Sequence, residues 1–308
     1  MIAAAASPNL SVRIGSMTMR NPVTTGSGTF GFGSETADLV DLNRVGAVCV
    51  KATTREPRAG NPPRRIVETP SGMLNAIGLQ NGGVDNYLAE KAPFLRRFDC
   101  PIIVNVPGEN PDDFAYVTAR ISDAGAADAV ELNISCPNVS HGLDYATDPR
   151  LTAEVVAACR RATGLPLIAK LSPNVSDIRP IARAAEEAGA DAISLINTLV
   201  GTSIDARTRR FRLANITGGL SGPAIKPIAL HLVYRVAQTV RVPIIGMGGI
   251  MNATDAVEFL LAGATAVAAG SVSFVNPAAV LEIPEGIAAY LTDNGFSDVR
   301  EIIGAVQA

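Results

Sequence analysis

Eight apolar runs of strand length recur along this 308-residue chain, and their spacing is that of a repeating β/α unit. They lie near residues 22–28, 45–53, 101–107, 129–135, 166–172, 192–199, 242–248 and 266–273. Most runs are continuous rather than alternating, which is typical of parallel strands covered on both faces. Helix-period segments such as 177–188 and 254–262 lie between them. The pattern predicts a single α/β domain over residues 1–308, a (β/α)₈ TIM barrel.

The residues that precede the runs alternate between two kinds, which supports the repeat. Proline precedes the odd-numbered runs and a Gly-Ala pair precedes the even-numbered runs, at Pro22, Pro101, Pro166 and Pro243 and at Gly46, Gly125, Gly189 and Gly263. Glycine past a helix end supplies a left-handed cap, and proline is tolerated at the first residue of a strand. A doubly wound open sheet is the alternative fold, but residues 25–31 contain only part of the Gly-x-Gly-x-x-Gly turn that it favours.

Two connections, residues 54–83 and 200–222, are longer than ordinary loops after barrel strands. Long loops at this position commonly cover the active site, so both are predicted to be insertions at the C-terminal face, with a further lid loop after the fourth strand. The second insertion carries four arginines that we interpret as a solvated loop face, at positions 207, 209, 210 and 212. A β-hairpin is expected before the first barrel strand.

Polar residues and glycines occur where the predicted strands end. In chain order they are Ser27, Lys51, Asn105, Asn133, Lys170, Asn197, Thr198, Gly248, Gly249, Gly270 and Ser271. Because barrel active sites lie at the carboxyl ends of the strands, the set predicts one site there. The glycine turns after strands seven and eight are typical of phosphate binding, since glycine lets backbone N–H groups approach an anion.

The asparagines and lysines of this set indicate a ligand with a planar polar ring. Each asparagine offers donors and an acceptor, as a ring with alternating C=O and N–H groups requires, and flavins and pyrimidines both have such rings. Lys170 is suited to stabilise negative charge on a reduced flavin or, alternatively, to form a Schiff base as in barrel aldolases. Lys51 is suited to pair with a substrate carboxylate or with the flavin.

Composition narrows the partners and the compartment. Lys plus Arg total 26 against 29 Asp plus Glu, so no net basic field favours nucleic acid or an anionic membrane. The first residues lack the features of a secretory signal, and the apolar stretch 256–273 is interrupted by charge and glycine, as in a buried helix followed by a buried strand. The four cysteines form no Cys-x-x-Cys pair, so no metal site is predicted and a reducing cytoplasm is the expected compartment.

Cys136 differs from the other cysteines in its position. It stands just past the fourth strand in Asn-Ile-Ser-Cys-Pro-Asn, where Pro137 ends ladder bonding and turns the chain over the barrel mouth. Its sulfur is therefore expected to face a ligand. Cys49, Cys100 and Cys159 fall in a strand, at a strand start and on a helix, and are expected to be small core or surface residues. With two histidines in the chain, a Ser-His-Asp triad is not favoured.

Together these residues resemble the class 1 dihydroorotate dehydrogenases over nearly the whole chain. The motifs that carry the resemblance are Ser-Gly-Thr-Phe-Gly-Phe-Gly at 27–33, Lys-Ala-Thr-Thr at 51–54, Asn-Ala-Ile-Gly-Leu-Gln-Asn at 75–81, the Cys136 stretch at 133–138 and Gly-Leu-Ser-Gly-Pro-Ala at 219–224. The first two look most like class 1B. The catalytic subunit of that class pairs with a second subunit that carries FAD and a [2Fe-2S] cluster and passes electrons to NAD⁺, in an assembly of two plus two subunits.

The resemblance implies an FMN site, an orotate site and a catalytic base. The implied FMN contacts are Ser27, Lys51, Ala52, Asn105, Asn133, Lys170, Ile196, Gly222, Gly248, Gly249, Gly270 and Ser271. The implied substrate contacts are Lys51, Asn75, Ala76, Ile77, Gly78, Leu79, Asn133, Asn138, Asn197 and Thr198. Cys136, assisted by Lys51, would remove the C5 proton of dihydroorotate while hydride passes from C6 to the flavin. The class 2 enzymes instead use serine as the base and carry an N-terminal membrane segment.

Two segments depart from the class 1B pattern. Residues 139–145 lack the expected lysine and paired glycines, and Asn-Gly-Gly at 81–83 lacks the proline that commonly stands in its middle. Both departures bear on loop closure and on the electron acceptor rather than on the proposed base. The alternatives are a fumarate-using class 1A homodimer, a phosphosugar aldolase or isomerase that uses Lys170, and a non-catalytic flavin-binding barrel.

Overall fold

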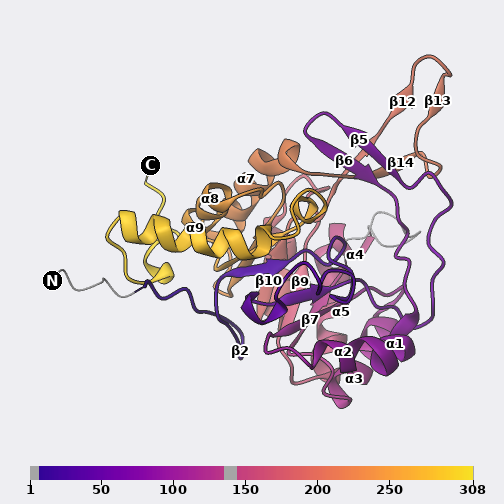
Figure 1. The fold of residues 1–308 in the computed structure, drawn as a ribbon. Helices are drawn as coiled ribbons and strands as arrows, with labels where there is room; N and C mark the ends of the chain where they lie inside the picture. The colour runs from indigo at the N-terminus through magenta and orange to yellow at the C-terminus, as the bar shows by residue number, and fades with distance from the viewer. Residues whose placement is uncertain (1–6, 135–143, 308) are drawn as a thin grey trace.

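The structure, a computed structural model, describes residues 7–134 and 144–307 and is organised around a parallel barrel (Figure 1). Its strands are β3 (Val23–Thr25), β4 (Val48–Val50), β7 (Ile102–Val106), β8 (Ala129–Leu132), β9 (Leu167–Lys170), β10 (Ala192–Leu195), β15 (Ile244–Met247) and β16 (Ala266–Ala269). Within these residues the eight strands form one sheet in the order β3-β16-β15-β10-β9-β8-β7-β4. Each predicted apolar run contains one of these strands, so the predicted barrel is confirmed.

The barrel closes between β3 and β4, largely through threonine side chains. Thr24 forms a parallel bridge with Ala47, and its Oγ1 donates to the Ala47 carbonyl at 2.9 Å. The hydroxyl of Thr25 donates to the Cys49 carbonyl at 3.0 Å and accepts from the Cys49 N–H at 2.9 Å. Because buried backbone groups need hydrogen-bond partners, these hydroxyls complete the ladder where few backbone bonds join the two strands.

Helices surround the barrel (Figure 1). The longer ones are α3 (Pro111–Asp123), α5 (Pro149–Ala162), α6 (Arg179–Glu187), α7 (Lys226–Ala237), α8 (Ala253–Leu261) and α9 (Ala279–Asp293). The shorter helical segments are η1 (Leu42–Arg44), α1 (Gly83–Asn86), η2 (Tyr87–Lys91), α2 (Ala92–Leu95), α4 (Asp144–Thr147), η3 (Pro223–Ile225), η4 (Ser271–Phe274) and η5 (Val299–Glu301). Side-chain caps from Asn110, Asp148 and Asn252 fix the starts of α3, α5 and α8. In the described part of the chain, none of the helices has both the length and the apolar character needed to cross a membrane.

The glycines that precede the even-numbered strands have two different roles. Gly125, Gly189 and Gly263 have φ angles of 59°, 103° and 112°, so they are the predicted left-handed caps. Gly46 has no positive φ. A Cβ at this position would collide with the carbonyl oxygens of Asn21 and Val23, so close approach of the backbone requires glycine there. The interpretation of Gly46 as a helix cap is therefore wrong.

The two insertions form a second sheet rather than open loops. Its strands are β5 (Ile66–Thr69), β6 (Gly72–Asn75), β11 (Leu199–Thr202) and β14 (Thr217–Ser221), paired antiparallel in the order β11-β14-β6-β5. The paired strands β12 (Ile204–Asp205) and β13 (Arg210–Phe211) project beyond it (Figure 1). The four arginines at 207, 209, 210 and 212 are exposed on this projection, which confirms their interpretation as a solvated face.

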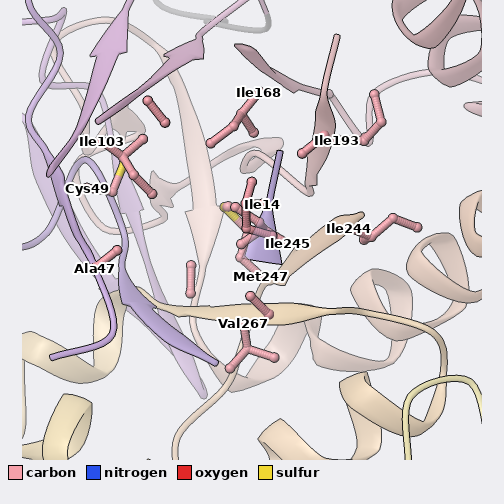
Figure 2. Close-up of a cluster of buried hydrophobic side chains, with 14 of the residues drawn as sticks. Ile14, Ala47, Cys49, Ile103, Ile168, Ile193, Ile244, Ile245, Met247 and Val267 are labelled. Carbon is pink, nitrogen blue, oxygen red and sulfur yellow. The ribbon is translucent and has the colours of Figure 1, made fainter. Parts of the chain in front are cut away.

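A hairpin of β1 (Val12–Ile14) and β2 (Met17–Met19) precedes the barrel, as predicted. Its turn residue Gly15 lies against Pro166 and Asp191, which precede β9 and β10, so the hairpin packs at the amino-terminal end of the barrel. Ile14 is fully buried among side chains from the barrel strands (Figure 2). The hairpin thus closes this end and leaves the carboxyl ends of the strands as the open face.

Tyr87 supplies a test of the packing between the helical segment η2 and the chain that leads into β8. Its ring is fully buried on η2, and its hydroxyl donates to the Ala126 carbonyl at 2.7 Å. We expect Tyr87→Phe to lower the free energy of unfolding by about 1 kcal/mol, because the carbonyl loses a buried partner. Tyr116→Phe is the control, since that hydroxyl accepts from Arg120 at the surface; its effect should stay within about 0.5 kcal/mol in urea titrations. Equal effects would contradict this account.

Candidate active site

A cavity of about 320 Å³ opens at the carboxyl ends of the barrel strands. Its wall comes from the turns after the strands and from the second sheet, which contributes Met73 and Asn75 of β6 and Ser221 of β14. Both insertions therefore border the cavity. A concave site in this position, built from several strand ends, is where a barrel binds its ligand.

Nearly all residues of the implied sites line this one cavity. The lining includes the whole implied FMN set, namely Ser27, Lys51, Ala52, Asn105, Asn133, Lys170, Ile196, Gly222, Gly248, Gly249, Gly270 and Ser271. From the implied substrate set it also includes Asn75, Ile77, Gly78, Leu79, Asn197 and Thr198. Cys136 and Asn138 lie outside the described residues. Residues far apart in the chain are thus brought together as the strand-end pattern predicts.

Ala76 is the exception in the implied substrate set, because its side chain does not border the cavity. It is fully buried with Leu74 and Leu213 in a small core of the second sheet. Its N–H donates to the Arg65 carbonyl at 2.7 Å and its carbonyl accepts from Asn61 Nδ2 at 3.0 Å. Successive side chains in an extended segment point to opposite faces, so Asn75 and Ile77 face the cavity while Ala76 faces away.

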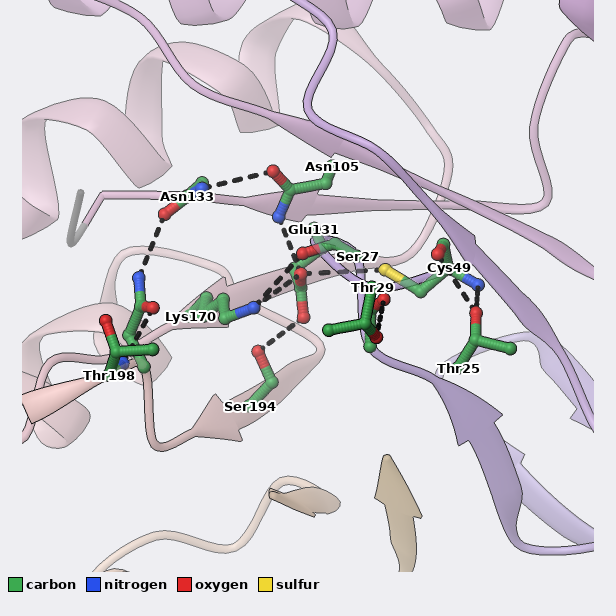
Figure 3. A network of polar contacts seen from close by, with 12 residues as sticks. Thr25, Ser27, Thr29, Cys49, Asn105, Glu131, Asn133, Lys170, Ser194 and Thr198 are labelled. Atoms are coloured by element: carbon green, nitrogen blue, oxygen red, sulfur yellow. Dashed lines mark hydrogen bonds and ion pairs between the residues drawn. The ribbon is translucent and has the colours of Figure 1, made fainter. Parts of the chain in front are cut away.

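Lys170 lies at the floor of the cavity in a buried ion pair. Its Nζ atom is 3.4 Å from Oε1 of Glu131 and 3.2 Å from the hydroxyl of Ser27 (Figure 3). The side chains of the pair are 8% and 3% exposed. Buried charges need a partner, and here the partner of the cation comes from the neighbouring strand β8. The floor therefore presents a fixed ammonium group to any ligand above it.

Three asparagines form a row of hydrogen-bonded amides across the cavity (Figure 3). Asn105 donates from Nδ2 to Glu131 Oε1 at 2.6 Å and accepts from Asn133 Nδ2 at 3.1 Å. Asn133 in turn accepts from Asn197 Nδ2 at 3.4 Å. The oxygen of Asn197 accepts from the N–H of Thr198 at 2.8 Å. The row gives the cavity oriented amide groups that match a planar ring with alternating donors and acceptors.

Lys51 also lines the cavity, just past β4. Its N–H donates to the Gly31 carbonyl at 2.8 Å, which fixes the backbone in the turn. Burial lowers the pKa of the Lys51 ammonium from its ordinary value, while the carboxylate of Glu35 acts in the opposite direction. A half-buried ammonium in a ligand cavity is suited to bind an anionic group, because charge-assisted hydrogen bonds to the anion replace the water contacts that the ammonium loses on burial.

The glycine turns leave room for an anion. Within residues 7–134 and 144–307, the N–H groups of Gly249 and Ser271 have no acceptor in the protein. A Cβ placed on Gly270 meets no atom within 4 Å, whereas one on Gly249 would approach the Gly222 carbonyl to 2.8 Å. Backbone donors without a protein acceptor, in glycine turns that line a cavity, fit a phosphate, and the ring-matching amides of the same cavity fit a flavin. The residues present are therefore compatible with FMN.

Two polar residues beneath the cavity, Glu131 and Ser194, are not among those predicted from the sequence. Both lie inside apolar strands, Ala-Val-Glu-Leu and Ala-Ile-Ser-Leu, rather than at strand ends. A charged residue in the middle of a buried strand is itself a signal, because such a residue needs a buried partner. The next strand of the sheet, β9, ends at Lys170, and this lysine is the buried partner.

The three cysteines of the described chain are buried thiols without a disulfide, Cys49, Cys100 and Cys159. Burial raises the pKa of Cys100 to about 11 and that of Cys159 to about 12, and it raises the pKa of Cys49 well above its ordinary value. Their interpretation as small core residues is confirmed. None of them has the accessible, easily ionised thiol that a catalytic base requires.

The fold and the cavity define the chain as a (β/α)₈ barrel with a cavity at the carboxyl ends of its strands. A family model described as dihydroorotate dehydrogenase matches residues 9–291, so the chain belongs to the dihydroorotate dehydrogenase family.

Named relatives agree with this assignment over the full length. The chain is 56% identical to a protein of Trichlorobacter lovleyi, covering 97% of this chain and 99% of the relative, and 55% identical to one of Geotalea daltonii, covering 98% and 99%. Both are named dihydroorotate dehydrogenase B (NAD(+)), catalytic subunit. A crystal structure of DHODH from Eimeria tenella in complex with ferulenol matches 98% of this chain and 90% of its own, with a TM-score of 0.82 and 23% identity. That similarity bears on the fold alone.

Proposed function

We propose that this protein oxidises (S)-dihydroorotate to orotate in pyrimidine synthesis. The observation that carries the proposal is that two lysines, four asparagines and two glycine turns line one cavity in a chain more than half identical to dihydroorotate dehydrogenase B catalytic subunits. The cavity offers a cationic floor, oriented amides and anion-binding turns in one place.

The protein would hold FMN with the turns and the floor of this cavity. Gly249, Gly270 and Ser271 would bind the phosphate, while Lys170 and the asparagine row would hold the polar edge of the ring. When bound, FMN supplies the acceptor for the hydride of the substrate. Lys170 would keep positive charge beside the ring, where negative charge develops on reduction.

The substrate would lie between the ring, Lys51 and the second sheet. Lys51 would receive the orotate carboxylate, and Asn75, Asn133 and Asn197 would orient the pyrimidine ring. Cys136, which follows Asn133 in the chain outside the described residues, would remove the C5 proton as general base. The protein residues thus orient the substrate and take one proton, while hydride leaves C6.

The proposal is tested by anaerobic mixing. The purified protein should be yellow, and its flavin absorbance should bleach when dihydroorotate is added without oxygen. Protein that binds FMN but does not bleach would contradict the proposed reaction. In the alternative of an aldolase, borohydride would trap a substrate on Lys170. The pairing of that amine with Glu131 opposes this alternative, because a protonated amine is a poor nucleophile.

The electron acceptor is proposed to be NAD⁺, reached through a second subunit that carries FAD and a [2Fe-2S] cluster in an assembly of two plus two. The names of the relatives, which specify NAD(+) and a catalytic subunit, support this choice. Co-purification of an iron-sulfur flavoprotein from the native host is expected. A homodimer that reduces fumarate without a partner would instead indicate the class 1A alternative. A reducing compartment such as the cytoplasm suits the unpaired thiols of the chain.

Lys51→Met is expected to separate binding from stability. The KM for dihydroorotate should rise by about 10- to 100-fold, because a charge-assisted contact is lost. The thermal stability of the apoprotein should stay the same or increase, because burial disfavours the Lys51 charge. Lys91→Met is the matched control: that ammonium lies 3.9 Å from Glu90 outside the cavity, so KM should not change. An unchanged KM together with lower stability for Lys51→Met would assign Lys51 a structural role.

A further inference from the structure

Glu131 is a buried carboxylate directly beneath the cavity, and the proposed reaction does not use it. It lies on β8 and is 3% exposed. Oε1 accepts from Asn105 at 2.6 Å and lies 3.4 Å from Lys170 Nζ and 3.6 Å from Cys49 Sγ, while Oε2 accepts from the hydroxyl of Ser194 at 2.8 Å (Figure 3). Burial of a carboxylate without partners costs roughly several kcal/mol of folding free energy. The hydrogen bonds and the ion pair around Glu131 offset this cost.

Glu131 reaches a ligand only through its neighbours. It does not border the cavity, but Lys170 and Asn105 do. Strand pairing places Glu131 beside Asn105 and places Lys170 beside Ser194, and the contacts of Glu131 with Lys170 and Ser194 join the two pairs inside the barrel. Any influence of Glu131 on a bound flavin would therefore act through the ammonium of Lys170 or the amide of Asn105.

The charge of Lys170 depends on this carboxylate. Apart from Glu131, its Nζ contacts the neutral hydroxyl of Ser27 at 3.2 Å. Burial favours the neutral form of an unpaired amine, and a nearby carboxylate favours the ammonium. The other titratable group in the cluster is the thiol of Cys49, and the neighbouring elements contribute the uncharged Asn105, Ser194 and Ser27. Glu131 is thus the one described anion in contact with Lys170.

The direction of the asparagine row depends on the same carboxylate. A carboxylate only accepts hydrogen bonds, so Asn105 must turn its NH₂ group toward Glu131. Its oxygen is then left to accept from Asn133, whose oxygen accepts from Asn197. Glu131 is the acceptor at one end of the row, so it determines which amide atoms of the asparagines face the ligand.

We propose that Glu131 is a positioning residue that keeps Lys170 charged at the cavity floor and fixes the direction of the asparagine row. The inference rests on the proposed FMN site. Glu131→Gln has the same shape but no negative charge, so it should let Lys170 lose its proton within the accessible pH range. The charge beside the flavin would then depend on pH.

The test is the midpoint potential of bound FMN, measured against pH without substrate. The wild-type profile should show no break from an amine, whereas Glu131→Gln should show an additional break at a pH below the ordinary titration range of lysine, because burial disfavours an unpaired ammonium. Relative to the wild type at the same pH, reduction of the flavin by dihydroorotate should be at least about tenfold slower in this variant at pH 8, and the deficit should shrink at lower pH, where the ammonium is restored.

Three further variants separate positioning from structure. Ser194→Ala removes the hydrogen bond to Oε2 but keeps the charge, so it should retain the wild-type profile. Glu131→Asp should remove most of the break because the charge returns. Glu131→Gln combined with Lys170→Met should show no break, because the titrating amine is gone. A Glu131→Gln protein that binds FMN and follows the wild-type profile would overturn the proposal.

Poor folding of Glu131→Gln would also decide the question. If the double variant folds while the single variant does not, the unpaired ammonium causes the defect and the coupling is supported. If both unfold alike, Glu131 is a packing residue only and the proposal fails. Failure of the proposed function gives a different result, because the wild-type protein itself would not bind FMN or would not bleach with dihydroorotate.

Discussion

Cys136→Ala is expected to retain FMN and to slow the reduction of the flavin by dihydroorotate by about 10²- to 10⁴-fold, the range for loss of a general base. The reason is that no other thiol can take its place. Cys49, Cys100 and Cys159 are buried, and burial raises the pKa of each. Stopped-flow absorbance under anaerobic conditions measures the rate, and an unchanged rate would remove Cys136 from the mechanism.

The pH profile and a matched cysteine variant complete this test. A cysteine acts as a base only as the thiolate, and an unperturbed thiol has a pKa of about 8.5. The wild-type rate should therefore rise from pH 7 to about pH 9. Burial holds the pKa of Cys159 at about 12, so this thiol stays protonated over the same range. Cys159→Ala should therefore keep both the rate and the alkaline rise, whereas Cys136→Ala should lose both.

Gly270→Val is expected to weaken FMN binding by about 10- to 100-fold, because the new side chain would occupy the space for the ligand. Gly270 lines the cavity, and a Cβ there meets no protein atom within 4 Å. The apoprotein should fold normally. Fluorescence titration of the apoprotein with FMN measures the dissociation constant, and circular dichroism checks the fold.

Gly164→Val provides the control for this substitution. Gly164 also has open space around its Cβ position, but it does not border the cavity, so the variant should bind FMN like the wild type. Gly249 would be a poor choice for the test, because a Cβ there would approach the backbone of Gly222 and Lys226 within 3 Å and disturb folding. Equal FMN affinities for Gly270→Val and the wild type would contradict the proposed position of the cofactor.

The barrel and most of the site follow from the sequence because both depend on position along a strand. Continuous apolar runs identify strands buried on both faces, and the last residue of each run marks the face where a barrel binds ligands. The strand-end pattern thus predicts one site for Lys51, Lys170 and the asparagines, and in the structure they line one cavity.

The remaining features depend on contacts between distant segments, which local patterns do not encode. The second sheet is an example: the proline- and glycine-rich segment 54–83 gives a weak strand signal, and β6 pairs with β14 more than a hundred residues away. Ala76 faces away from the cavity because of strand alternation within that sheet. The role of Gly46 depends on the carbonyl of Asn21, and that of Glu131 depends on neighbours from four different strands.

The second sheet also affects how this protein can be engineered. Asn75 of one insertion pairs with Gly219 of the other and donates to its carbonyl at 3.3 Å, and Gly219 has no room for a side chain beside Thr198. Asn75, a residue of the cavity wall, is therefore held in place by the other insertion. Exchange of one insertion with that of a relative would break this register, so substrate preference should transfer only when both segments are transplanted together.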